Sequence, residues 1–192
     1  MVNGMRSKRR IVIVGAESVL GRRLCEICAA DTDEVIAVAL TGSLEDAAAA
    51  CGSQPIDMLI FADDMDLDNA ISTAKRPEMR DALYRLTYAP FKLATLLRPA
   101  VAAAGGRVAL CSRATSLMER EAADGRFVDR PFRAAAHALW KCLEIEWRDD
   151  NVRLLIVALR DPGDAAYVTT EARSETASAA LLVDGNGSPL HW

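Results

Sequence analysis

The chain has 192 residues, 51% of them apolar, and a formal charge of −4 at pH 7. At about 150 residues per domain, this length indicates a single domain (1–192) that can bury one core. The acidic balance argues against nucleic acid or an anionic membrane surface as the main partner. Because the sequence contains no run of about 18 consecutive apolar residues, no membrane span is predicted.

A cluster of basic residues lies just ahead of the first predicted strand: Arg6, Lys8, Arg9 and Arg10. Such a cluster is typical of a solvated tail, and we expect residues 1–9 to be flexible. No apolar segment precedes the strand, which argues against secretion and for a cytoplasmic protein. The scattered cysteines fit that compartment, and the CxxC pair Cys25 and Cys28 falls inside a predicted helix. We therefore expect buried thiols and no metal site.

Short apolar runs alternate along the chain with helical patterns. Strands are predicted at residues 11–14, 34–40, 58–62, 108–111 and 152–158. Helices are predicted at 18–30, in a short alanine-rich segment capped by Ser43, at 78–104, at 131–148 and around 175–182. The alternation predicts βαβ units and hence the α/β class, as a Rossmann-like, doubly wound, mainly parallel sheet with helices on both faces.

The longest predicted helix, 78–104, carries one apolar stripe and two prolines. The stripe follows a 3.6-residue period through Leu83, Leu86, Leu93, Leu97 and Val101. Pro90 and Pro99 have no N–H to donate along the helix, so we expect kinks at both.

A glycine-containing turn follows the first strand, at the position where a doubly wound fold binds pyrophosphate. Gly15 and Gly21 hold the outer two glycine positions, and Ser18 or Val19 stands where an inner glycine is expected. We predict a nucleotide contact here from Gly15, Ser18, Val19, Leu20 and Gly21. The alternative is that the two glycines only make a tight strand-to-helix turn.

Two further strand ends bear on this prediction. An acid that holds the ribose is expected about 20 residues after the turn, but the second strand ends in Leu-Thr-Gly-Ser at 40–43. The third strand ends in Ala62, Asp63 and Asp64, at the edge where ligands bind in such sheets. Ala62 and Asp63 therefore join the predicted cofactor contacts, although Asp63 and Asp64 also suit the start of a polar loop.

These segments resemble the short-chain dehydrogenase/reductase family in consistent order over almost the whole chain. The family's opening strand and GAxGxxG turn are matched by IVIVGAESVLGRRL, and its next strand landmark by IDMLIFADD. Its long helix and serine strand are matched by YRLTYAPFKLATLLRPAVAAAGGRVALCSR, and its later helix, strand and Pro-Gly turn by ALWKCLEIEWRDDNVRLLIVALRDPG. The resemblance implies an NAD(P)-binding fold, with about one βα unit missing between Leu40 and Ile56.

The family's acid–base residues are not found at the matching positions. An ungapped match places the catalytic tyrosine on Asp129 and the lysine on Arg133, and a gapped match places them on Phe132 and Ala136. The asparagine position falls on Arg85. By this resemblance the chain lacks the standard proton relay, in which a tyrosine with a lowered pKa transfers the proton.

Three residues remain as catalytic candidates: Ser112, the hydroxyl nearest the end of the serine strand, with Asp129 and Arg133. Asp129 equally suits a helix N-cap ahead of Pro131, and an Asp–Arg pair four residues apart stabilises a helix start. His137, one turn further on, is interpreted as a surface or core histidine with a base as the alternative.

Two functions stay open. The first is a divergent member of the family that binds NAD(P) and a small-molecule ligand, and performs an atypical oxidoreduction or non-redox acid–base chemistry. The second is a pseudoenzyme that binds a partner through its helices. In either case the resemblance implies a homo-oligomer through helices 78–104 and 131–148, where Trp140 and Trp147 form an apolar stripe that suits an interface or the core.

Overall fold

The computed structural model describes residues 8–31, 33–40, 42–62, 65, 71–114, 129–160, 164–173 and 181–190. Its strands form one six-stranded sheet in the order β2-β1-β3-β4-β5-β6. Their bounds are β1 Arg10–Val14, β2 Glu34–Val38, β3 Met58–Phe61, β4 Arg107–Arg113, β5 Arg153–Leu159 and β6 Leu182–Asp184. Every neighbouring pair of strands is parallel. The predicted α/β, Rossmann-like architecture is confirmed.

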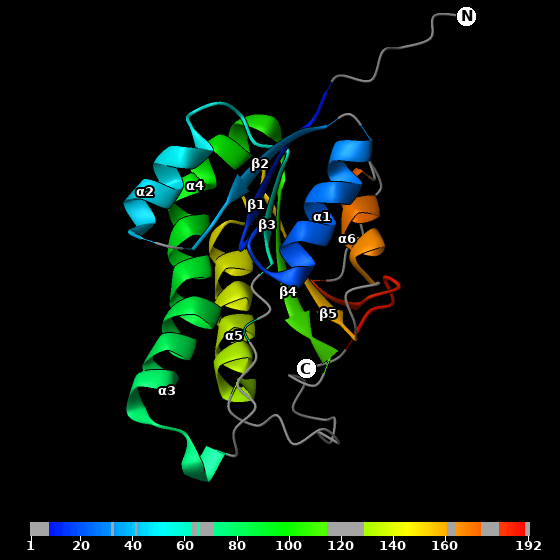
Figure 1. Ribbon diagram of the computed structural model, residues 1–192. Coiled ribbons are helices and arrows are strands. Elements are labelled where there is room, and N and C mark those ends of the chain that lie inside the picture. The colour runs from blue at the N-terminus through cyan, green and yellow to red at the C-terminus, as the bar shows by residue number, and fades with distance from the viewer. Residues whose placement is uncertain are drawn as a thin grey trace, which may run out of the picture.

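Helices cover both faces of this sheet (Figure 1). On one face lie α2 Leu44–Cys51, α4 Ala89–Ala104 and α5 Arg130–Glu146, and on the other lie α1 Val19–Ala30 and α6 Ala165–Arg173. The chain also forms a short 3₁₀ helix, η1 Ile71–Thr73, and helix α3 Arg76–Leu83, which leads through a π-helical turn into α4. None of the helices in the described segments is long and apolar enough to cross a membrane.

The sheet separates two apolar clusters. Strands β1 and β3 expose almost nothing, as expected for central parallel strands that are covered on both sides. Their alternate side chains enter one cluster with α2, α4 and α5 and the other with α1 and α6. Trp140 and Trp147 are fully buried in the first cluster. These two tryptophans therefore belong to the core, and the alternative that they form an interface is wrong.

The basic N-terminal cluster does not end where the sequence suggested. Lys8 is exposed, but Arg10 is the first residue of β1. Its guanidinium donates to the carbonyl oxygens of Gln54 and Cys51, and its Nε lies 3.5 Å from a carboxylate oxygen of Glu34. Arg10 is thus part of the sheet and not of a solvated tail, because its long side chain reaches the end of α2.

The long predicted helix is interrupted at its middle. Residues Tyr84–Tyr88 form the π-helical segment η2, in which the N–H of Ala89 donates to the carbonyl of Tyr84. The proline ring of Pro90 clashes with a carbonyl four residues earlier, which favours this wider turn. The extra residue shifts the helical phase, so Leu83 is exposed although the rest of the predicted stripe is buried. Pro99, by contrast, lies inside α4, which continues to Ala104.

The C-terminal region differs from the prediction. Residues 175–180 lie outside the described part of the chain, but Leu182 belongs to β6, not to a helix. A three-residue strand is too short to show a periodic pattern in sequence. Its end is fixed by Asp184, whose carboxylate accepts from the N–H groups of Asn186 and Ser188. Helix α6 was not predicted.

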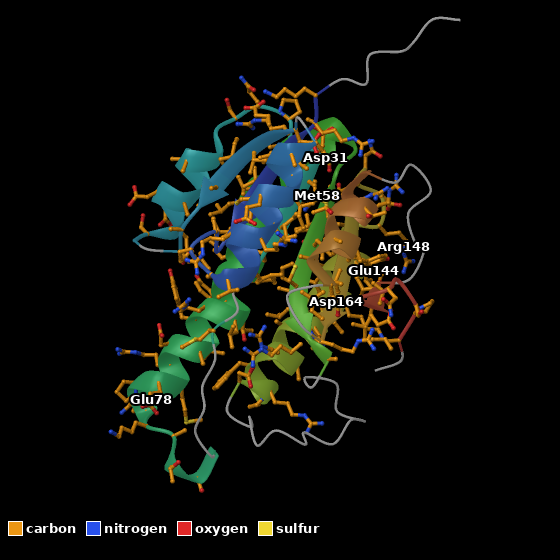
Figure 2. The ribbon with its side chains drawn as sticks, turned by 45° about the vertical axis from the view of Figure 1, so that its right-hand side comes forward. Asp31, Met58, Glu78, Glu144, Arg148 and Asp164 are labelled. Atoms are coloured by element: carbon orange, nitrogen blue, oxygen red, sulfur yellow. The ribbon has the colours of Figure 1, made fainter. Side chains whose placement is uncertain are left out.

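The order of the strands decides where a ligand would bind. Chain connections leave β1 in opposite directions toward β2 and β3, so the topological switch point lies between β1 and β3. Helix α3 and the first turns of α5 reach beyond the carboxyl ends of the strands (Figure 1). In Figure 2, the labelled Asp31 and Met58 lie toward the opposite, amino edge, and Glu78 marks the far end of α3. β2 is an edge strand of the sheet.

Candidate functional site

The glycine turn brings the backbone of α1 against the end of β1. Gly15 has φ +84°, in the left-handed region that favours glycine. A Cβ on Gly21 would stand 2.2 Å from the carbonyl oxygen of Gly15 and 2.8 Å from Cα of Ala16. Both glycines therefore serve the close approach of strand and helix that a dinucleotide turn requires.

Ser18 takes the place of the inner glycine and caps α1. Its hydroxyl accepts from the N–H of Gly21 at 2.8 Å and donates to the carbonyl of Ala62 at 2.6 Å. This buried side chain thus bridges the ends of β1 and β3 from beneath the turn. Val19, the first residue of α1, is 56% exposed, whereas the side chain of Leu20 is buried in the core. Leu20 can accordingly contact a ligand only through its backbone.

At the end of β3, the predicted cofactor contacts are resolved in part. Ala62 is fully buried, and its N–H donates to the carbonyl of Val14 while its own carbonyl receives the Ser18 hydroxyl. Asp63 and Asp64 lie outside the described residues. The hydrogen bond between Ser18 and Ala62 therefore joins the turn after β1 to the end of β3 at the switch point.

Glu17 is a site residue that the sequence reasoning missed. Its carboxylate oxygen Oε1 accepts from the N–H of Leu40 at 3.2 Å, just beyond the end of β2. A carboxylate thus lies where the ribose acid was expected, but it comes from the turn and not from the segment after β2. No local pattern signals this contact, because the two residues are 23 positions apart.

A buried hydrogen bond joins the end of β4 to the middle of α5. The side chains of Ser112 and His137 meet at 2.7 Å between Oγ and Nε2. Ser112 is 4% exposed and His137 2%. A short contact between a hydroxyl and an imidazole nitrogen permits proton transfer between them, and the tautomer decides which one donates.

Asp129 and Arg133 lie on the two turns of α5 that precede His137. Nε of Arg133 donates to Oδ2 of Asp129 at 3.0 Å, and both side chains are buried. Nη2 of Arg133 also donates to the carbonyl of Met65 at 3.2 Å. The predicted Asp–Arg pair is confirmed, whereas the predicted N-cap bond is wrong: Asp129 has helical backbone angles, and its side chain makes no capping hydrogen bond.

The charge of Arg133 acts on both neighbours of Ser112. Burial, together with the positive charge of Arg133, lowers the pKa of His137 to about 4. Burial raises the pKa of the Cys111 thiol to about 12, with Arg133 opposing that shift. At neutral pH the imidazole is therefore uncharged, while the thiol stays protonated and inert.

The π-helical segment packs beside this cluster. Arg85, at the expected asparagine position, lies within η2. The hydroxyl of Thr87 donates to the carbonyl of Phe132 at 2.7 Å, which fixes η2 against the first turn of α5. Single π turns inside α-helices are frequent at functional sites. The arrangement holds the helix that carries Arg133 and His137 in a fixed place.

The two parts of the site share one edge of the sheet. In the strand register, Phe61 is level with both Val14 and Leu110. Ser112 thus lies two residues past that level, on the strand next but one to β1. Two strand spacings amount to about 10 Å. The structure therefore places the glycine turn and the Ser112–His137 pair at one carboxyl edge, with Asp129 and Arg133 further toward the start of α5.

Several solved structures with the same architecture are described as short-chain dehydrogenases or reductases. A carbonyl reductase from Pseudomonas aeruginosa PAO1 superposes with a TM-score of 0.79 at 20% identity, over 96% of this chain and 100% of that one. The chain has their fold. A short-chain dehydrogenase from Streptomyces avermitilis gives 0.76 at 18% identity over 94% and 88% of the two chains. No family model and no curated protein matches the sequence.

One structure of this fold was solved with its cofactor. A putative short-chain dehydrogenase/reductase from Burkholderia multivorans, with bound NADP, has a TM-score of 0.76 at 13% identity, over 96% of this chain and 100% of that chain. At such identities the likeness shows the fold and not the activity. The chemistry has to be argued from the residues of this chain.

Proposed function

We propose that the chain binds a nicotinamide dinucleotide at the switch point and catalyses hydride transfer between it and a small alcohol or carbonyl. In this proposal Ser112 contacts the substrate oxygen and His137 exchanges a proton with Ser112. The observation that carries the proposal is the 2.7 Å contact between Ser112 Oγ and His137 Nε2 at the ligand-binding edge of the sheet.

The glycine turn supports the cofactor part. Gly15 and Gly21 fit the close approach that a dinucleotide needs, and the pyrophosphate would lie against the first turn of α1, at Ser18, Val19 and Leu20. Ala62 would border the bound cofactor just after β3, and the predicted contact Asp63 lies outside the described residues. A protein of the same fold binds NADP. A bound nicotinamide would supply or accept the hydride.

The residues of this chain provide the proton path. In the alcohol-to-carbonyl direction, the substrate hydroxyl gives its proton to Ser112 Oγ as the hydride leaves the carbon, and Ser112 passes its own proton to the neutral His137 Nε2. The proton would return to solvent as the product leaves, because an imidazole with a pKa of about 4 does not stay protonated at neutral pH. Burial and the positive charge of Arg133 keep the imidazole neutral. This path would take the place of the family's tyrosine and lysine, which the resemblance does not find at the matching positions of this chain.

Binding and turnover can be tested in sequence. We would titrate the protein with NADH and NADPH, followed by nicotinamide fluorescence and by melting temperature, which a ligand of the folded state must raise. A panel of short alcohols with NAD⁺ and NADP⁺ would then be followed through nicotinamide absorbance. We expect Ser112→Ala and His137→Asn to bind nucleotide as wild type does but to lose about 10²–10⁴-fold in rate.

Arg148→Gln is the matched control, because Arg148 is exposed and lies two residues past the end of α5, beside the labelled Glu144 (Figure 2) and eleven residues after His137. It should leave binding and rate unchanged. If neither nucleotide bound at millimolar concentration, or if His137→Asn turned over at the wild-type rate, the proposal would be wrong.

A second candidate function is favoured by a different observation. Asp129 and Arg133 satisfy each other in a buried ion pair, and Ser18 and Glu17 are bonded to neighbouring backbone groups. Groups engaged in this way suit a fold kept for binding, without catalysis. A protein that bound NADH but turned over none of the panel would support this pseudoenzyme.

We also propose a homo-oligomer through helices 78–104 and 131–148. Large apolar side chains are exposed on these helices: Met79, Leu83, Tyr84, Tyr88, Leu96 and Ile145. Tyr84 and Tyr88 form a pair with ring centroids 5.9 Å apart. Exposed aromatic and aliphatic side chains on neighbouring helices are typical of a protein interface.

A further inference from the structure

The outer side of β2 presents backbone groups that the sheet does not use. Within the described part of the chain, β1 is the one strand that pairs with β2 (Figure 1). The N–H of Glu34 donates to the carbonyl of Arg9, and the carbonyl of Val38 accepts from the turn after β1, so both residues face β1. Backbone groups alternate between the two sides of a strand, so those of Val35 and Ala37 point outward. They form the row of donors and acceptors to which another strand can pair.

This edge lacks the features that usually prevent such pairing. Edge strands are commonly protected by charged side chains, by proline or by a bulge. β2 has the sequence Glu-Val-Ile-Ala-Val, and its register with β1 runs without interruption. Its one charge, on Glu34, is drawn toward β1, because Oε1 lies 3.5 Å from Nε of Arg10. Ala37 and Ala39 are exposed, so the middle of the edge is uncharged and accessible.

We propose that β2 pairs with β2 of a second copy of this chain, antiparallel about a two-fold axis, so that the two sheets join into one. Two copies of the same edge form a closed pair about a two-fold axis. Only in the antiparallel arrangement can the same residue of each strand exchange both N–H···O bonds with its copy. With Ala37 at the axis, Ala37 lies opposite Ala37, and Val35 of each copy lies opposite Ala39 of the other.

The side chains fit this register. Directly opposite residues of an antiparallel pair lie on the same face of the sheet, about 4.5–5.5 Å apart between Cβ atoms. On the face covered by α2, Ile36 of each copy meets Val38 of the other, and on the face covered by α1 the pairs are the small and apolar ones named above. The two copies of Glu34 lie at opposite ends of the paired segment, about 20 Å apart at 3.4 Å per residue, so their charges do not oppose the pairing.

This contact is separate from the helix contact proposed above and does not rest on nucleotide binding. It uses the edge of the sheet, whereas the helix contact uses exposed side chains of α3, η2, α4 and α5. Two different two-fold contacts would close four copies into a tetramer. A strand of five residues makes a small contact, and small interfaces are typical of weak association. By itself, the β2 pair should therefore form only at high protein concentration.

Amide hydrogen exchange followed by NMR at micromolar and at millimolar concentration observes the edge directly. The Ala37 N–H points outward, so it should exchange fast in a single copy and slow down as the copies pair. We expect its exchange at the higher concentration to be at least about ten-fold slower. The Ile36 N–H is the internal reference, because it faces β1 in the single copy as well and should not change.

A charge at the axis tests the same contact by mutation. Ala37→Lys places two like charges directly opposite each other and leaves the bonds to β1 in place. We would compare it by sedimentation velocity at millimolar concentration in the Tyr88→Glu background, in which the proposed helix contact is disrupted. We expect at least about ten-fold weaker self-association. Ala166→Lys is the matched control, since Ala166 is an exposed alanine on α6 and takes the same charge. Melting temperatures would show that both variants fold.

Three results would overturn the proposal. They are equal exchange of the Ala37 N–H at both concentrations, a Tyr88→Glu protein that stays monomeric at millimolar concentration, and equal association of Ala37→Lys and Ala166→Lys. The helix contact fails by a different result, in which Tyr88→Glu associates as wild type does. Slow exchange at Ala37 in that case would still support the β2 pair.

Discussion

Gly21 leaves no room for a side chain, because the atoms that a Cβ would meet belong to the backbone of Gly15 and Ala16. Backbone cannot rotate away as a side chain can, so Gly21→Ala must push α1 from the strand. We expect it to lower the free energy of unfolding by about 2–3 kcal/mol, after a gain of about 1 kcal/mol in helix propensity. Urea unfolding measures the change.

Arg23→Ala provides the comparison, since Arg23 is exposed on the same helix two residues later. Such a surface substitution should change the free energy of unfolding by no more than about 0.5 kcal/mol. Equal stability of the two variants would contradict the tight contact at Gly21.

His137 should make stability fall in mild acid. Its pKa in the folded protein is lowered to about 4, by burial and by Arg133, from about 6.5 in the unfolded chain. Above pH 6.5 both states are neutral. As the pH falls from 6.5 through 4, only the unfolded state takes up the proton, so stability decreases by up to about 3 kcal/mol.

The measurement is the free energy of unfolding of wild type and His137→Gln between pH 8 and 4. Carboxylates titrate in both proteins, so their contribution cancels in the difference. We expect the difference to shrink as the pH falls below 6.5, since glutamine does not titrate. Parallel curves for the two proteins would mean that His137 already takes up a proton in the folded state.

Side-chain partners were predictable only where they are close in sequence. The spacing of Asp129 and Arg133 is enough to predict their ion pair, because four residues make one helical turn. The contact between His137 and Ser112 depends instead on how α5 lies across β4, and that of Glu17 with Leu40 on how the turn meets β2. No local sequence pattern determines how these elements pack against each other. The sequence therefore indicated Ser112 and His137 as separate candidates but not the contact between them.

The contact between η2 and α5 depends on one hydroxyl. Thr87 is buried and donates to the carbonyl of Phe132. Thr87→Val keeps the shape but leaves that carbonyl without this donor, so we expect a loss of about 1–2 kcal/mol in the free energy of unfolding. Thr95→Val is the control on α4, because the exposed Thr95 hydroxyl only bonds to Phe91 of its own helix. Chemical denaturation of both variants tests the difference.

Elements were predicted well where a long pattern defines them. The five longer strands and α1 match their predicted ranges within a few residues. Pro90 predicted an irregular helix near residue 90, but the sequence did not show whether the helix would kink or form a wider turn. The π-helical turn shifts the helical phase, so Leu83 lies at the surface. Strand β6 is held by pairing with β5 and by the turn after Asp184, both of which need the finished sheet.

At the scale of the molecule, the alternation of apolar strands and amphipathic helices was sufficient to predict the class and the doubly wound sheet. Right-handed crossovers leave few ways to arrange such units. The position of the site follows from the same rule, because the switch point fixes the ligand edge. The strand and helix pattern does not show which side chains stay exposed on the folded protein. The proposed interface therefore has to be tested on those side chains.

Tyr88→Glu tests that interface. Tyr88 is 47% exposed, so a charge there should change the fold little but should disrupt a helix-packed homo-oligomer. By sedimentation velocity at micromolar concentration, we expect wild type to sediment as a dimer or larger and Tyr88→Glu to dissociate at least about 30-fold more readily. Val19→Glu is the control, since Val19 is equally apolar and exposed but lies on the opposite face of the sheet. A monomeric wild type, or equal dissociation of both variants, would show that these helices do not join copies of the chain.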